Sequence, residues 1–199
     1  MAFNQFNLKR VQTELGLEIV DGEFFADVPE AKLKPEFYET FEESATLGLA
    51  VNTEKAKSEF IIAPILIEVK KILRGEISLF SGVELDVDAA KGLTGVCDFV
   101  ISKARQQHIL TAPLITVVES KNDNLRDGYG QCIAEMYAAQ IFNERSNNNI
   151  NRIYGIVTIG SAWKFLMLEG NTVTLNLTEY FVDNPAKIVG IIVSIITNS

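Results

Sequence analysis

The chain has 199 residues, of which 47% are hydrophobic and 22% are charged. This composition excludes a disordered or collagen-like chain, and the length predicts a single domain over residues 1–199. The 18 basic and 26 acidic residues give a formal charge of −8, which excludes a protein that coats nucleic acid through an overall positive charge. Two cysteines are too few for a disulfide framework, so we expect reduced thiols and a cytoplasmic protein.

The first part of the chain predicts helices. Pro35 suits the first turn of a helix. Thr53 can cap a longer helix over 54–73, which Pro64 should kink or break. Residues 1–50 are therefore expected to form an N-terminal helical segment ahead of the core.

The middle of the chain alternates between strands and a helix. Apolar and β-branched runs predict the strands, and helical periodicity returns over 125–144. The predicted strands cover 76–86, 92–102, 113–119, 153–159, 163–169 and 172–177. This order predicts an α/β (α+β) fold with a mixed central β-sheet flanked by helices, whose core covers about residues 54–169.

The last apolar run, Ile188–Ile196, is too short to span a bilayer. It predicts a buried C-terminal helix over about 185–198, with a subunit interface as the alternative. We therefore expect no membrane partner.

Glu119 and Lys121 stand at the end of the apolar strand predicted at 113–119. Because successive strand residues point to opposite faces, these two side chains should lie on the same face. Buried charges must be paired or bind a metal. Two other Glu-x-Lys triplets begin at Glu30 and Glu68. The first falls in a predicted loop, and the second lies on a helix, where residues two apart do not face each other.

Asp98 interrupts the apolar run over 96–101. Its separation from Glu119 allows the two strands to be antiparallel neighbours, so that both carboxylates converge at one end of the sheet. Two hard oxygen ligands with open positions suit Mg²⁺ or Mn²⁺. The alternative is a structural ion pair without a function.

The motif Asp98…Glu119-x-Lys121, with Glu59 on the helix before it and Gln131 on the helix after it, resembles the PD-(D/E)XK nuclease superfamily. That superfamily has the restriction endonuclease-like fold, and the resemblance covers most of the chain by the order of its elements. The order of one helix, three strands, a helix and a strand makes the short motif more specific.

The resemblance implies a role for each matching residue. Asp98 and Glu119 would be metal ligands for Mg²⁺ or Mn²⁺, with the backbone carbonyl of Ser120 and the helix carboxylate of Glu59 as further ligands. Lys121 would be the catalytic lysine that positions or activates the attacking water.

The chain departs from the family pattern at two places. Cys97, and not a proline, precedes Asp98, although many members of the family lack that proline. In the helicase-associated nucleases, a tyrosine follows the helix glutamine by four residues. Here Gln131 is followed at that spacing by Glu135, while Tyr137 comes two residues later. Gln131 is expected to contact the lysine or a phosphate, and the alternative is a surface position on its helix.

The function that the resemblance implies is a Mg²⁺-dependent, DNA endonuclease-like phosphodiester hydrolase, which would act on DNA as a homodimer. An inactive binding or assembly module of the same fold is the main alternative, and the acidic charge favours it. A small-molecule hydrolase is a third. Basic side chains around the carboxylates would favour the nuclease. The candidates for such a basic rim are Lys103, Arg105, Lys121, Arg126 and Lys164.

Overall fold

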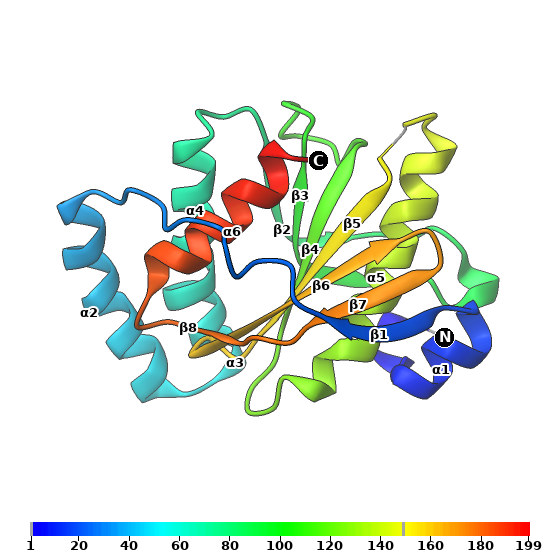
Figure 1. Ribbon diagram of the computed structural model, residues 1–199, viewed down its shortest axis with the longest axis horizontal. Helices are drawn as coiled ribbons and strands as arrows, with labels where there is room; N and C mark the ends of the chain where they lie inside the picture. Colours follow the sequence, from blue (N-terminus) through cyan, green and yellow to red (C-terminus); the bar gives the residue numbers. More distant parts are fainter. Residues whose placement is uncertain (1, 149) are drawn as a thin grey trace.

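The computed structural model describes residues 2–148 and 150–199, and in them a mixed β-sheet lies between two layers of helices (Figure 1). The predicted α/β (α+β) class is confirmed. The strands are β1 (Glu18–Gly22), β2 (Ser78–Glu84), β3 (Val96–Ser102), β4 (Leu114–Ser120), β5 (Arg152–Thr158), β6 (Ala162–Glu169), β7 (Thr172–Asn176) and β8 (Tyr180–Phe181). The α-helices are α1 (Leu8–Leu15), α2 (Pro35–Val51), α3 (Glu54–Lys57), α4 (Ala63–Ile72), α5 (Arg126–Arg145) and α6 (Pro185–Thr197).

The strands lie in the order β1-β7-β6-β5-β4-β3-β2, and β8 pairs with β6. The three strands β2, β3 and β4 are antiparallel neighbours, whereas β4 and β5 are parallel. Parallel neighbours need a crossover connection, and α5 provides it. Because β3 and β4 run in opposite directions, the beginning of β3 lies beside the end of β4.

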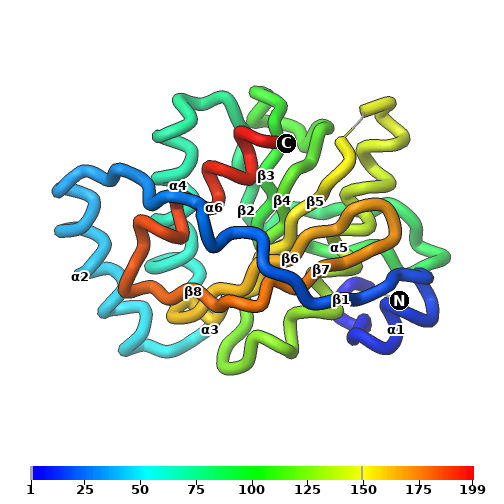
Figure 2. Tube along the Cα trace, viewed as in Figure 1, coloured from blue at the N-terminus to red at the C-terminus, as the bar shows by residue number. Residues whose placement is uncertain are grey.

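Helices cover both faces of the sheet, and each face has its own apolar core. Helices α1 and α5 cover one face, and α2, α4 and α6 cover the other (Figures 1 and 2). Trp163 belongs to the second core. Its indole N–H donates to the carbonyl of Gly160 at 3.0 Å, so this side chain is buried structure and offers no surface for stacking a base.

The C-terminal apolar run forms α6, and Asn184 caps it by accepting from the amide of Lys187 at 3.2 Å. Its isoleucines are buried against the rest of the chain. The run therefore forms a buried helix whose isoleucines pack within the chain. In the part of the chain that the structure describes, no helix is long and apolar enough to cross a membrane.

The predicted long helix after Thr53 is continuous and contains a π-helical turn. The short α3 leads into this turn over Ser58–Ile62, and α4 follows with Pro64 in its first turn. The backbone stays helical on both sides of the turn, so the helix does not break at Pro64. The prediction missed β1, which pairs with β7 in parallel and forms one edge of the sheet.

Candidate active site

Asp98 and Glu119 come together at the end of the sheet where β3 begins and β4 ends, at the lower edge in Figure 1. In the ladder between β3 and β4, Phe99 pairs with Val118. One residue further along both strands, Asp98 therefore lies opposite Glu119. A side-chain oxygen of Asp98, Oδ2, accepts the amide N–H of Ser120 at 2.8 Å. The convergence expected from the sequence is therefore present, and Asp98 is fixed to the last residue of the neighbouring strand.

Lys121 follows β4 and lies on the same side as Glu119. Its ammonium forms an ion pair with Oε1 of Glu119 and also donates to Oε1 of Gln131 at 3.3 Å. The amide nitrogen of Gln131 donates to Oε2 of Glu119 at 2.8 Å. These three side chains form a closed ring of hydrogen bonds, which places Gln131 in contact with the lysine as the sequence suggested.

Glu135 joins this ring from one helical turn further along α5. Its Oε1 accepts from the amide nitrogen of Gln131 at 3.1 Å. Its side chain is fully buried, and Oε2 has no hydrogen-bond partner among the described residues. The sequence prediction named this residue only as a departure from a family pattern, although its spacing of four from Gln131 puts both side chains on one face of a helix.

Burial and mutual repulsion change the acidity of these carboxyl groups. Burial, followed by the charge of Asp98, raises the pKa of Glu119 to about 7. Burial also raises the pKa of Asp98, although the amide of Ser120 opposes the shift. The pKa of Glu135 is raised well above its usual range, first by burial and then by the Glu119 carboxylate. Burial by itself would lower the pKa of Lys121, but the Glu119 carboxylate raises it above its usual value.

The raised pKa of Glu119 predicts that stability falls as the pH rises. The folded state holds the proton up to about pH 7, whereas the unfolded chain releases it near pH 4.5. Between these values the folded protein binds more protons, so Glu119 should contribute a decrease of up to about 3 kcal/mol in the free energy of unfolding between pH 4.5 and 7. The raised pKa of Glu135 contributes a further decrease of the same sign as the pH rises. Urea denaturation at a series of pH values measures this change.

Glu119→Gln should make that fall in stability less steep, and Glu169→Gln, at the exposed end of β6, should leave it unchanged. An equally steep fall in Glu119→Gln would contradict the assignment of the proton to Glu119.

Two glycines let α5 approach the site closely. A Cβ on Gly128 would lie 2.6 Å from Val157 Cγ1 and 3.1 Å from Lys121 Cγ. A Cβ on Gly130 would overlap the backbone of Phe6 and Asn7. Both glycines are buried within the helix, so Gly128 lets the beginning of α5 lie against Lys121, and Gly130 lets it lie against the segment before α1.

The structure does not bring Glu59 into the ring. This residue lies on the π-helical turn, and its carboxylate pairs with Lys55 at 2.7 Å, with 52% of its side chain exposed. Glu54, at the start of α3, is instead close enough for its charge to raise the pKa of Lys121. Lys57 is buried nearby and donates to the carbonyl of Asn122 at 2.6 Å, which holds the loop that follows β4.

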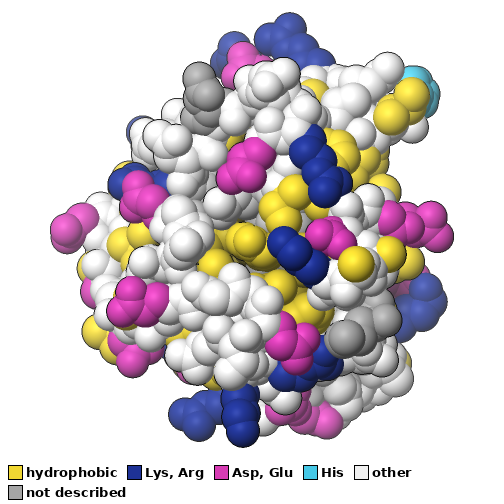
Figure 3. Space-filling view, turned by 90° about the vertical axis from the view of Figure 1, so that its right-hand side faces the viewer, with side chains coloured by type: hydrophobic (Ala, Val, Ile, Leu, Met, Phe, Trp, Pro, Cys, Tyr) yellow, Lys and Arg dark blue, Asp and Glu magenta, His cyan; other side chains and the backbone are white. Residues whose placement is uncertain are grey.

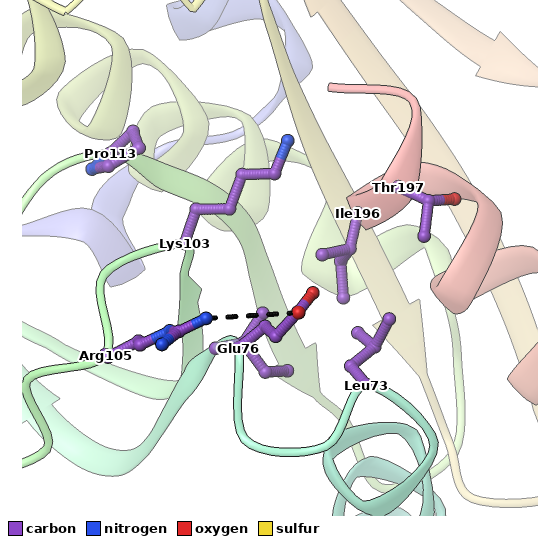
Figure 4. Close-up of a pocket in the computed structure, with 8 residues that line it drawn as sticks. Leu73, Glu76, Lys103, Arg105, Pro113, Ile196 and Thr197 are labelled. Carbon is purple, nitrogen blue, oxygen red and sulfur yellow. Dashed lines mark ion pairs between the residues drawn. The ribbon is translucent and has the colours of Figure 1, made fainter.

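The basic side chains do not form one rim around the carboxylates. Lys103 and Arg105 follow β3 and therefore lie at the opposite end of the sheet, where they line a cavity of about 560 Å³ (Figure 4). Arg105 points toward Glu76 at 3.9 Å, and Lys103 donates to the carbonyl of Ser199. Their place at that end contradicts the expected rim for these two residues.

Lys164 does lie at the correct end. It pairs with Val157 on β5, and Val157 pairs with Glu119 on β4. Directly paired residues share a face, so Lys164 is on the side of Glu119, two strands or roughly 10 Å away. Its ammonium donates to the carbonyl of Leu177 at 3.1 Å, and the side chain is largely buried.

The oxygen donors fit a hard divalent cation. Asp98 and Glu119 supply two carboxylates, and the carbonyl of Ser120 directly follows Glu119 in the chain. Each carboxylate has about four lone-pair positions, so the hydrogen bonds to Glu119 leave capacity for a cation. Mg²⁺ is commonly bound through one or two carboxylates and keeps several waters. Among residues 2–148 and 150–199, no group of three or more His, Cys, Asp or Glu side chains is arranged to hold a metal.

Comparison of the chain with protein-family models, with curated proteins and with solved structures gives no match. The function has to be inferred from the residues and their arrangement.

Proposed function

We propose that this chain is a divalent-metal-dependent phosphodiester hydrolase that cleaves DNA as an endonuclease. The observation that carries the proposal is the Lys121 ammonium, which is held between Glu119 and Gln131 at the same end of the sheet as Asp98. A lysine beside two converging carboxylates is the arrangement that the resemblance to the PD-(D/E)XK superfamily implies. The order of α4, three antiparallel strands, α5 and a parallel β5 further supports it.

Each residue has a distinct role in this proposal. Asp98, Glu119 and the carbonyl of Ser120 would hold Mg²⁺ or Mn²⁺. When bound, such a cation polarises the phosphate, lowers the pKa of a bound water and stabilises the leaving oxygen. Lys121 supplies a compact positive charge on a flexible stem, which can orient the attacking water beside the phosphate. Gln131 restrains that stem through its amide oxygen.

The protein has a formal charge of −8, which opposes the approach of a polyanion. A divalent cation at Asp98 and Glu119 would reverse the local sign of the potential, because bound cations are often the largest charges in a site. The proposal therefore requires metal for binding of DNA as well as for cleavage.

The test is a cleavage assay with the purified full chain. Supercoiled plasmid, single- and double-stranded oligonucleotides and RNA are incubated with Mg²⁺ or Mn²⁺, beside samples that contain EDTA. We expect metal-dependent cleavage of DNA that falls by at least about a hundredfold in Asp98→Asn and in Glu119→Gln.

Glu59→Gln is the matched control, because its carboxylate is exposed and pairs with Lys55. It should cleave at the wild-type rate. Cleavage that survives EDTA, or that Asp98→Asn and Glu119→Gln leave unchanged, contradicts the proposal, and selective cleavage of RNA would change the substrate.

A binding or assembly module is the second candidate, and the placement of the basic residues favours it. Lys103 and Arg105 lie at the far end of the sheet from the carboxylates. On the face in Figure 3, basic and acidic side chains are interspersed without one basic patch. Absence of cleavage, together with no heat of Mn²⁺ binding in calorimetry, would favour this candidate over the nuclease.

A further inference from the structure

Glu135 is a fully buried carboxyl group beside the site. Its Oε2 has no hydrogen bond of acceptable geometry among the described residues, while its Oε1 accepts from Gln131 at 3.1 Å. Its carboxyl also lies close enough to that of Glu119 for the two to interact. Leaving a buried polar atom unsatisfied destabilises the folded state. A leucine or methionine would fill similar space without this cost, so the acid requires an explanation other than packing.

The hydrogen bonds of the Gln131 amide show what the acid provides. One amide nitrogen donates to both Glu119, at 2.8 Å, and Glu135, at 3.1 Å, while the amide oxygen accepts from Lys121 at 3.3 Å. All three hydrogen bonds are consistent with a single orientation of the Gln131 amide. The reversed amide would place its oxygen against two carboxyl groups and its N–H groups against an ammonium.

The three partners of Gln131 belong to two different parts of the fold. Glu119 and Lys121 belong to the end of β4 and are paired with each other. Glu135 belongs to the same helix as Gln131, one turn away, where side chains four residues apart are neighbours. It is therefore the partner that ties the half-buried Gln131 to its own helix and limits its escape into solvent.

We propose that Glu135 is a positioning residue, which anchors the Gln131 amide to α5 so that the amide oxygen stays on the Lys121 ammonium. Without this anchor, Gln131 gains rotamer freedom and Lys121 loses a fixed acceptor. The anchoring itself is independent of any reaction, but its effect on catalysis rests on the proposed function.

The same helix contains a matched control. Gln140 donates to Glu144 at 3.2 Å, with the same spacing of four residues, on the exposed side of α5. Glu144→Leu removes an equivalent hydrogen bond far along the helix from Lys121. It should leave both Gln131 and the site unchanged.

The first test follows the Gln131 side chain by NMR in ¹⁵N-labelled full-length protein. Its NH₂ signals are assigned by their loss in Gln131→Met. In Glu135→Leu and Glu135→Met, hydrogen exchange of these protons should accelerate by at least about fivefold, because the amide is released to solvent. Glu135→Gln keeps a carbonyl acceptor and should stay close to the wild-type rate, as should Glu144→Leu.

The second test measures cleavage of DNA by the same variants. Glu135→Leu and Glu135→Met should lower kcat by about tenfold or more with little change in KM, because a misplaced catalytic group affects the reacting geometry. Glu135→Gln should restore most of kcat. A loss that Glu135→Gln does not restore, or that Glu144→Leu reproduces, would overturn the proposal.

The two tests separate the two proposals. If the wild-type protein cleaves nothing, the proposed function fails, and the exchange of the Gln131 amide alone decides the anchoring. Unchanged exchange in Glu135→Leu and Glu135→Met overturns it. If both variants fail to fold while Glu135→Gln folds, Glu135 serves the fold itself, and a role confined to Gln131 is also overturned.

Discussion

Lys121→Met is expected to lower the rate of DNA cleavage by at least about a hundredfold while the protein still binds Mn²⁺, since loss of a group that acts in the transition state typically costs about 10²–10⁴ in rate. The structure gives the reason for this separation. The ammonium contacts Glu119 and Gln131, whereas the proposed ligands remain in place. Removing the lysine also removes a cation that competes with the metal for Glu119. Mn²⁺ affinity at pH 8, measured by calorimetry, should therefore be retained or increased.

Lys55→Met is the control for this variant. Its side chain is 82% exposed and its ammonium pairs with Glu59, so cleavage should stay near the wild-type rate. Equal activity of Lys121→Met and Lys55→Met would remove Lys121 from the reaction. Loss of Mn²⁺ binding in Lys121→Met would instead show that Lys121 is needed to keep the metal site intact.

Gly190→Ala is expected to destabilise the protein by about 1–3 kcal/mol, the range typical of overpacking in a well-packed core. An added Cβ at this position in α6 would overlap the carbonyl oxygen of Pro29 and lie 3.0 Å from the amide nitrogen of Ala31. These are backbone atoms, and the amide of Ala31 already donates to Ala186 at 2.9 Å. The segment cannot yield without losing that hydrogen bond.

Helix propensity alone predicts the opposite sign, because alanine stabilises a helix by about 1 kcal/mol relative to glycine. Denaturant unfolding therefore distinguishes the two effects directly. Ser194→Ala, on the less buried side of the same helix, should change stability by less than about 0.5 kcal/mol. A stability increase in Gly190→Ala would show that the segment moves aside without loss.

The sheet core could be predicted from the sequence because its strands are long and apolar. The run over Leu114–Val118 is completely buried, as its aliphatic and β-branched residues, with Thr116 the one polar member, indicated. The strand β1 was missed because Glu18–Gly22 is short and partly exposed at an edge. Its strand conformation depends on pairing with β7, and a single stretch of sequence does not contain that information.

The site was predictable where strand alternation and strand order decide it. They place Asp98, Glu119 and Lys121 at one end of the sheet. The same rule explains why Lys103 and Arg105 do not join them. These two residues follow β3, and antiparallel β3 and β4 finish at opposite ends of the sheet. Glu135 was not recognised, because α5 is buried on most of its surface and its sequence pattern does not show which side faces β4.

The pairing of β1 with β7 has a consequence for synthesis of the protein. Glu18 pairs with Thr172, so β1 leaves the ribosome long before its partner exists. At about 5–20 residues per second, the wait is roughly 8–30 s. An unpaired strand is exposed to aggregation during that time, and charged residues are a common protection. The exposed Glu18 and Asp21 supply that protection until the nascent chain can complete its sheet.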